Sequence, residues 1–228
     1  MRARLVDSHE LAPNTRHFVF ESQEWPAAFV PGQFLSVTAT VGDDEITRAY
    51  SIVSPPGGNR FALCANLVLE GHLSPFLFAL NPGDEIGFKG PYGAFILRRP
   101  VSDSLFVATG TGIAPFRSML LSKLAENPDQ RFTLLFGVRY EHSLLYHDEF
   151  VALAKAHSNF DYQPTLTRPE PNWTGRTGRV QPHALELLGD RRDVDVYICG
   201  LREMVDDLRL QLKERGFDRK RIIYEKYD

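Results

Sequence analysis

The pattern of apolar and turn residues changes near residue 100, and this change restricts the fold more than any other feature of the sequence. Before it, short runs rich in β-branched and aromatic residues alternate with turn residues such as Pro-Gly and Gly-Pro. Short strands at this spacing are typical of an antiparallel barrel or sandwich. A short helix interrupts them, and Ser74 is expected to cap it with Pro75 as its first residue. The expected strands are Arg16–Glu21, Phe34–Thr40, Arg48–Val53, Phe61–Leu69 and Asp84–Lys89.

After residue 100, apolar runs of strand length alternate with segments of helical spacing. Such alternation predicts a parallel sheet with helices on both faces. We therefore expect two domains, an antiparallel β-barrel at residues 1–99 and an α/β parallel-sheet domain at residues 100–228. The expected strands are Ser104–Ala108, Arg131–Val138, Asp161–Leu166, Val194–Cys199 and Arg221–Tyr227, and the expected helices are Pro115–Glu126, Tyr146–Ala156, Ala184–Leu188 and a last one through Met204 that ends at Gly216.

Composition excludes several classes of function. The net charge of -3 gives no general basic field for nucleic acid or an anionic membrane. The two cysteines, Cys64 and Cys199, can form neither a disulfide framework nor a four-thiolate zinc or iron–sulfur site. His142 and His147 match no standard ligand spacing, so no metal site is expected. With no apolar run long enough to span a membrane and no signal segment, a cytoplasmic protein is expected. We also expect a monomer.

The segment Thr109-Gly110-Thr111-Gly112 is the first candidate binding motif. A strand ends there, two glycines allow close approach of the backbone to a ligand, and Pro115 begins a helix. Free N–H groups and the helix dipole at such a point favour a phosphate or pyrophosphate. A tight strand-to-helix turn with nothing bound is the alternative.

Two more segments have the residue types of a nucleotide site. In Arg48-Ala49-Tyr50-Ser51, an arginine suits a pyrophosphate, a tyrosine ring can pack on a planar heterocycle, and a serine can hydrogen-bond a ring nitrogen. An ordinary barrel strand is the alternative. The segment Gly71-His72-Leu73-Ser74 opens the short helix and offers a second anion site.

Together these segments resemble the ferredoxin–NADP reductase superfamily over the full length of the chain. The resemblance implies an FAD-binding barrel followed by a nicotinamide-nucleotide domain. The segments that carry it, in order, are Pro31-Gly32-Gln33-Phe34, Arg48-Ala49-Tyr50-Ser51, Gly71-His72-Leu73-Ser74, Pro82-Gly83-Asp84, Gly90-Pro91-Tyr92-Gly93, Gly110-Thr111-Gly112-Ile113-Ala114-Pro115 and Cys199-Gly200.

The resemblance also implies roles for single residues. Arg48 would hold the FAD pyrophosphate, Tyr50 would lie against the isoalloxazine, and Ser51 would hydrogen-bond near N5. The backbone of the Gly71–Ser74 segment would cradle the diphosphate of FAD, and that of the Thr109–Gly112 segment the pyrophosphate of the dinucleotide.

In the second half, the Cys199-Gly200 pair would lie beside the nicotinamide ring. Glu225 and Tyr227 match the acidic and aromatic residues that end plant-type members, in which the aromatic covers the flavin and must move for nicotinamide to dock; here Asp228 follows Tyr227. The arginines implied near the 2′-phosphate of NADP are Arg139, Arg168, Arg176 and Arg179.

The implied activity is hydride transfer between NADP(H), or alternatively NAD(H), and bound FAD, with Ser51, Cys199, Glu225 and Tyr227 at the reacting rings. A ferredoxin, a flavodoxin or an oxygenase component would be the electron partner. The alternatives are a free-flavin reductase, the reductase subunit of an oxygenase, and a subunit that binds both nucleotides without turnover.

Overall fold

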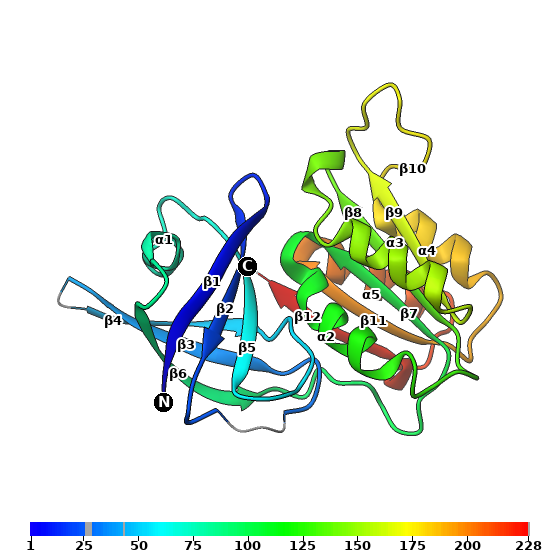
Figure 1. Cartoon of the computed structure of the whole chain (residues 1–228). Helices are drawn as coiled ribbons and strands as arrows, with labels where there is room; N and C mark the ends of the chain where they lie inside the picture. The colour runs from blue at the N-terminus through cyan, green and yellow to red at the C-terminus, as the bar shows by residue number, and fades with distance from the viewer. Residues whose placement is uncertain (26–28, 43, 228) are drawn as a thin grey trace. The chain divides into compact units, whose positions relative to one another are not determined.

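The first half of the chain forms an antiparallel six-stranded sheet in the order β4-β3-β6-β1-β2-β5 (Figure 1). Past the end of β4, Ile52 pairs with Leu63 of β5, and the Val53 amide donates to the Ala62 carbonyl at 2.9 Å. The outer strands therefore meet, and the sheet curls into the expected barrel. Its strands are β1 (Arg2–Ala12), β2 (Thr15–Glu21), β3 (Phe34–Val41), β4 (Asp44–Ser51), β5 (Arg60–Asn66) and β6 (Glu85–Tyr92).

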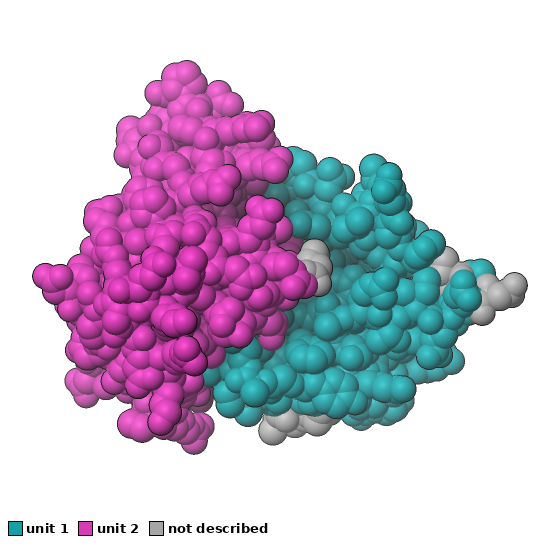
Figure 2. All heavy atoms as spheres, turned by 180° about the vertical axis from the view of Figure 1, so that it is seen from behind, with its two compact units in different colours: residues 1–96, 114–122 teal, residues 97–113, 123–228 magenta. Residues whose placement is uncertain are grey.

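The structure is a computed structural model that describes residues 1–25, 29–42 and 44–227. They fall into two units, coloured separately in Figure 2: residues 1–96 with 114–122, and residues 97–113 with 123 onward. Helix α2 (Ala114–Lys123) thus groups mostly with the first unit. There the Arg117 guanidinium donates to the Val53 carbonyl at 3.0 Å and the Ser118 hydroxyl to the Ser54 carbonyl at 2.7 Å.

An aromatic core holds the first sheet together. The ring of Trp25 lies 4.7 Å from that of Phe61, which lies 5.1 Å from that of Phe88. Phe18 and Phe20 of β2 are fully buried in the same cluster. Each such side chain contributes roughly 1.5–3 kcal/mol through burial, and this fixes which face of each strand is inside.

The expected strands of the first half all occur, with shifted ends, but three expectations were wrong or incomplete. Strand β1 was missed because its apolar residues are separated by charged ones. Strand β5 ends at Asn66 and not at Leu69, since the Leu67 amide turns back to the Asn14 carbonyl at 2.8 Å. Helix α1 (Leu73–Ala79) begins before Ser74 and is preceded by His72, which makes no side-chain capping bond.

The second half forms a parallel six-stranded sheet in the order β10-β9-β8-β7-β11-β12. The expected strands and helices are confirmed with ends shifted by a few residues, and the two-residue β10 was not foreseen. The strands are β7 (Ser104–Thr109), β8 (Phe132–Val138), β9 (Phe160–Leu166), β10 (Arg176–Thr177), β11 (Asp195–Leu201) and β12 (Ile222–Tyr227). The helices of this unit are α3 (His147–Ala156), α4 (Val180–Leu188) and α5 (Arg202–Glu214), with short 3-10 helices η1 (Gly110–Ile113), η2 (Glu141–Ser143) and η3 (Arg219–Arg221).

Helices cover both faces of this second sheet. Helices α4 and α5 pack on one face through an apolar cluster that includes Leu105, Val196 and Leu208. Helix α3 packs on the other face (Figure 1). There the ring of Phe150 lies 5.4 Å from that of Tyr162 in β9. After β7, the next strand along the chain, β8, pairs with one edge of β7. The later strand β11 pairs with the opposite edge of β7, so the strand order reverses there. Ligands of such sheets bind beyond the carboxyl ends of the strands at this reversal of order.

Candidate functional site

The glycine-rich turn lies at the reversal of strand order, directly after β7. Gly110 has a φ of 54°, and a β-carbon on it would meet no atom within 4 Å. No acidic residue lies in the first turn of η1 or of α2. Backbone N–H groups at the start of a helix have no intrahelical acceptor. A turn that is open at Gly110, with backbone donors at a helix start and no acidic residue in that first turn, fits a pyrophosphate.

The turn is locked against the end of β11 by contacts that only glycine allows. A β-carbon on Gly112 would lie 2.4 Å from the Cys199 carbonyl oxygen, and one on Gly200 would lie 2.2 Å from Thr109 Oγ1. The Thr109 hydroxyl also accepts from the Leu201 amide at 3.3 Å. Two motifs almost ninety residues apart therefore form one rigid edge.

Three of the four residues expected at the reacting rings lie together on β11 and β12. Cys199 pairs with Glu225 in the parallel register, and the side chain of Tyr227 hydrogen-bonds to Cys199. Burial raises the pKa of the Cys199 thiol well above its usual range, and the nearby Glu225 raises it further. The thiol is therefore neutral, a packing group and not a nucleophile. Ser51, the fourth expected residue, is buried on β4 of the first unit, and Asp228 lies outside the described residues.

The four arginines proposed for the 2′-phosphate do not share one environment. Arg139, Arg168 and Arg179 are exposed at the carboxyl ends of β8 and β9 and just after β10. The Arg168 guanidinium donates to the Tyr140 hydroxyl at 3.1 Å. Tyr140 had no role in the sequence-based expectations, because only the pairing of β8 with β9 brings it to Arg168.

Arg176 is instead held inside the unit. Its guanidinium donates to both carboxylate oxygens of Glu186, at 2.8 and 3.2 Å, and to Gln163 Oε1 at 2.9 Å. It also contacts His183 Nδ1 at 3.1 Å. These bonds lower the pKa of Glu186. With its donors directed to internal acceptors, Arg176 joins β10 to α4.

In the first unit, β4 brings its motif next to α1. Arg48 and Tyr50 pair with Val37 and Leu35 of β3, whose side chains face the barrel interior. Tyr50 packs against the core, and this burial raises the pKa of its phenol, so that it stays neutral. Arg48 and Ala49 are exposed, and α1 contacts both β3 and β4.

The loop before α1 is folded by Ser74. Its hydroxyl accepts from the Val68 amide at 2.9 Å and donates to the Val68 carbonyl at 3.3 Å. The Gly71 amide donates to the same carbonyl at 2.9 Å. Val68 and Leu69 are exposed in this loop, with 57% and 82% of their surfaces accessible. The exposed Arg48 on β4 fits the phosphates of a flavin nucleotide. The half-buried ring of Tyr50 and the apolar loop at Val68 and Leu69 fit its flat rings.

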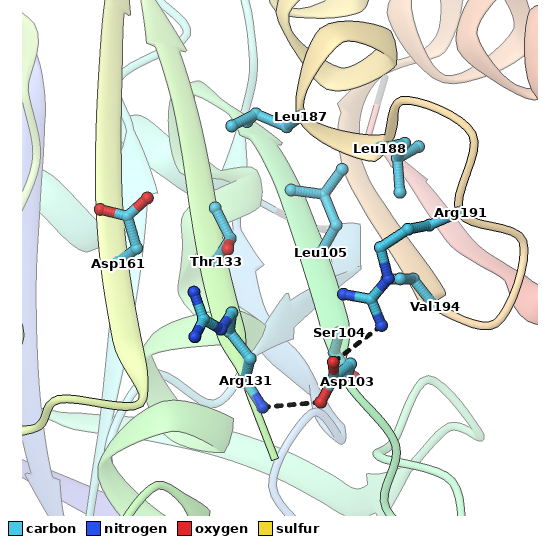
Figure 3. Close-up of a pocket in the computed structure, with 10 residues that line it drawn as sticks. All are labelled: Asp103, Ser104, Leu105, Arg131, Thr133, Asp161, Leu187, Leu188, Arg191 and Val194. Atoms are coloured by element: carbon cyan, nitrogen blue, oxygen red, sulfur yellow. Dashed lines mark hydrogen bonds and ion pairs between the residues drawn. The ribbon is translucent and has the colours of Figure 1, made fainter.

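A cavity of about 280 Å³ lies at the opposite edge of the second sheet, at the amino ends of β7, β8 and β9 (Figure 3). There Arg191 is held by Asp103 at 2.8 Å and by Asp193 at 3.1 Å. Arg131 and Asp161 add one charge of each sign. None of the motif residues lines this cavity, and its charges largely neutralise one another.

The described part of the chain contains no cluster of three or more histidine, cysteine or carboxylate side chains able to hold a metal ion. Among the same residues, no helix is long and apolar enough to cross a bilayer.

Comparison with known proteins gives two family matches. Residues 2–96 match the oxidoreductase FAD-binding domain, and residues 106–209 match the oxidoreductase NAD-binding domain. The chain is 40% identical to ferredoxin–NADP reductase B of Sorangium cellulosum over 99% of this chain and 97% of that protein. It is 31% identical to the toluate 1,2-dioxygenase electron transfer component of Pseudomonas putida, of which it covers 59%. A solved ferredoxin–NADP⁺ reductase from Neisseria gonorrhoeae with bound FAD and NADP is similar with a TM-score of 0.84 and 25% identity, over 100% of this chain and 97% of that one.

Proposed function

The chain belongs to the ferredoxin–NADP reductase family, and we propose that it exchanges hydride between NADP(H) and bound FAD, and electrons between FAD and a ferredoxin- or flavodoxin-type carrier. One observation carries the proposal. In each unit, motifs distant in sequence come into contact: β4 with α1 in the first unit, and the β7 turn with the end of β11 in the second.

The first site would hold FAD. When bound, FAD accepts a hydride and can release electrons singly, which is the chemistry the protein itself lacks. Arg48 pairs with the diphosphate, together with the backbone of Gly71–Ser74. Tyr50 packs on the isoalloxazine, and the Ser51 hydroxyl donates near its N5.

The second site would hold NADP(H). The backbone N–H groups from Gly110 to Gly112 bind the pyrophosphate, because the turn is open at Gly110 and has no acidic residue in its first turn. Arg139, Arg168 and Arg179 bind the 2′-phosphate, which favours NADP(H) over NAD(H).

The nicotinamide ring would lie at the end of β11 and β12. Cys199 offers it a neutral, buried surface beside Gly200, and Glu225 and Tyr227 lie at the same edge. These residues orient the ring and exclude water, and orientation of this kind lowers the barrier without a covalent step.

A separate protein would carry the single electrons, since the two cysteines of this sequence cannot ligate an iron–sulfur cluster. A ferredoxin or flavodoxin is the first candidate, and the similarity to an oxygenase electron transfer component favours an oxygenase component as the second. We infer a cytoplasmic monomer as the working form.

The test is a visible spectrum of the purified protein during anaerobic titration with NADPH and, in parallel, NADH. A yellow protein that bleaches at lower NADPH than NADH concentration supports the proposal. A colourless protein that turns over added flavin would favour a free-flavin reductase. An artificial dye is then added as electron acceptor. A yellow protein that bleaches but does not reduce this dye would favour a binding subunit without turnover.

A further inference from the structure

Strands β8 and β9 lie side by side (Figure 1), and their pairing continues past both strand ends, which brings Tyr140 beside Arg168. The Thr167 amide donates to the Val138 carbonyl at 3.0 Å, and the Arg168 amide donates to the Arg139 carbonyl at 2.8 Å. This ladder places Arg139-Tyr140 against Thr167-Arg168. The two arginines therefore leave the sheet at the same edge.

The Tyr140 ring is itself held in place. It stacks on the His142 ring, with centroids 5.3 Å apart and planes 12° from parallel. The Tyr140 carbonyl accepts from the Ser143 amide at 3.0 Å, which fixes the backbone at the start of η2. The phenol oxygen is thus a fixed acceptor, and the Arg168 guanidinium donates to it at 3.1 Å.

This contact leaves most of the guanidinium available. An arginine head has five N–H donors, and the bond to Tyr140 uses one of them. An unrestrained arginine loses side-chain rotamer entropy when it is ordered by a ligand, so a neighbour that orders the side chain in advance favours binding. Arg139 and Arg179 have no comparable bond to any described side chain, and the donors of Arg176 are directed to internal acceptors.

We propose that Tyr140 is a positioning residue that holds Arg168 ready for the 2′-phosphate and so sets much of the preference for NADP(H). This inference rests on the proposed function, since it requires the 2′-phosphate to bind at the β8–β9 edge. Tyr140 does not touch the reacting rings, and its effect passes through Arg168.

Calorimetric binding of 2′,5′-ADP and of 5′-ADP to the FAD-loaded protein tests the inference without turnover. The variants are Tyr140→Phe, which keeps the ring and its stack, Arg168→Ala, and the double variant. Tyr162→Phe is the matched control, because it removes another phenol oxygen of this unit, one that contacts His147 at 3.3 Å.

We expect Tyr140→Phe to weaken 2′,5′-ADP binding about fivefold, the equivalent of one ordinary hydrogen bond, and to leave 5′-ADP unchanged. Arg168→Ala should cost more, and the double variant should be no weaker than Arg168→Ala. In turnover, Tyr140→Phe should raise KM for NADPH but not for NADH, with kcat unchanged. Tyr162→Phe should match the wild type throughout.

Four results would overturn the inference. Unchanged 2′,5′-ADP binding in Tyr140→Phe, with a loss in Arg168→Ala, rejects Tyr140 but keeps Arg168 as a phosphate contact. Equal weakening of both ligands, or additive losses in the double variant, would mean a general structural role. Wild-type protein that binds both ligands equally would reject the proposed NADP(H) preference itself, and the inference with it.

Discussion

Gly112 and Cys199 approach so closely that a β-carbon on the glycine would lie 2.4 Å from the cysteine carbonyl oxygen. The same β-carbon would lie 2.7 Å from the Gly200 amide nitrogen, so the obstacle is backbone and not a movable side chain. The turn after β7 and the end of β11, which we propose to bind the pyrophosphate and the nicotinamide, are therefore packed as one rigid piece. A change in either should affect both.

Gly112→Ala should destabilise the protein by about 3 kcal/mol, because overpacking against fixed backbone forces strands β7 and β11 apart. Gly110→Ala is the matched control. It meets open space and bears only the cost of a positive φ, about 1 kcal/mol. Urea unfolding of the two variants without added nucleotide makes the comparison, and equal losses would disprove the close packing.

Arg48→Ala should weaken FAD binding by roughly 10- to 100-fold, the value of one charge-assisted hydrogen bond to a phosphate. The ratio of flavin to protein after dialysis measures it. Arg2→Ala is the control, since Arg2 pairs with Glu85 on the surface at 3.1 Å and has no proposed contact with FAD. Full retention of flavin in Arg48→Ala would remove this residue from the site.

Ser74→Ala should also lower FAD retention, although the Ser74 hydroxyl bonds to the backbone of Val68. Without it the Val68 amide loses its acceptor, at a cost of about 1–3 kcal/mol, and the backbone from Gly71 to Ser74 loses its fixed form. Ser122→Ala removes a helix hydroxyl that bonds only to the Ser118 carbonyl among the described residues, and serves as the control. Equal flavin content in both variants would contradict a positioning role for Ser74.

Replacing both Arg168 and Arg179 with Ala should reduce the NADPH-over-NADH preference in kcat/KM by at least about tenfold, since two phosphate contacts are lost. Arg176→Gln should behave differently. It should lower the thermal unfolding temperature, because Glu186 and Gln163 lose their partner, while changing the preference less than the double replacement. The opposite ranking would place Arg176 at the phosphate.

Stability should fall in mild acid because of His17. Burial, reinforced by Arg117, lowers the pKa of His17 to about 4 from its ordinary 6.5. Below pH 6.5 the unfolded chain binds a proton that the folded protein does not, so stability declines down to about pH 4, by up to about 3 kcal/mol. His17→Gln should flatten this decline in urea unfolding series, and an unchanged slope would refute the assignment.

The sequence by itself determined the kinds of elements and their order. Period-two runs and turn residues predicted the barrel strands, and alternating strand and helix patterns predicted the parallel sheet, because local propensity and burial on one face act over a few residues. The glycine pair after β7 and the Arg-Ala-Tyr-Ser strand were recognisable for the same reason. Strand β1 escaped notice, since its charged residues hide a pattern that only pairing with β2 and β6 makes clear.

Only the tertiary structure decided which groups remain available for a ligand. Arg176 and Arg179 look alike in sequence, yet one is bound by Glu186 and the other is exposed. Ser74 looks like a helix cap but folds the preceding loop, and Tyr140 meets Arg168 through a sheet register. The Arg176–Glu186 and Tyr140–Arg168 contacts join residues 10 and 28 positions apart, and such distances are fixed by packing and not by local sequence.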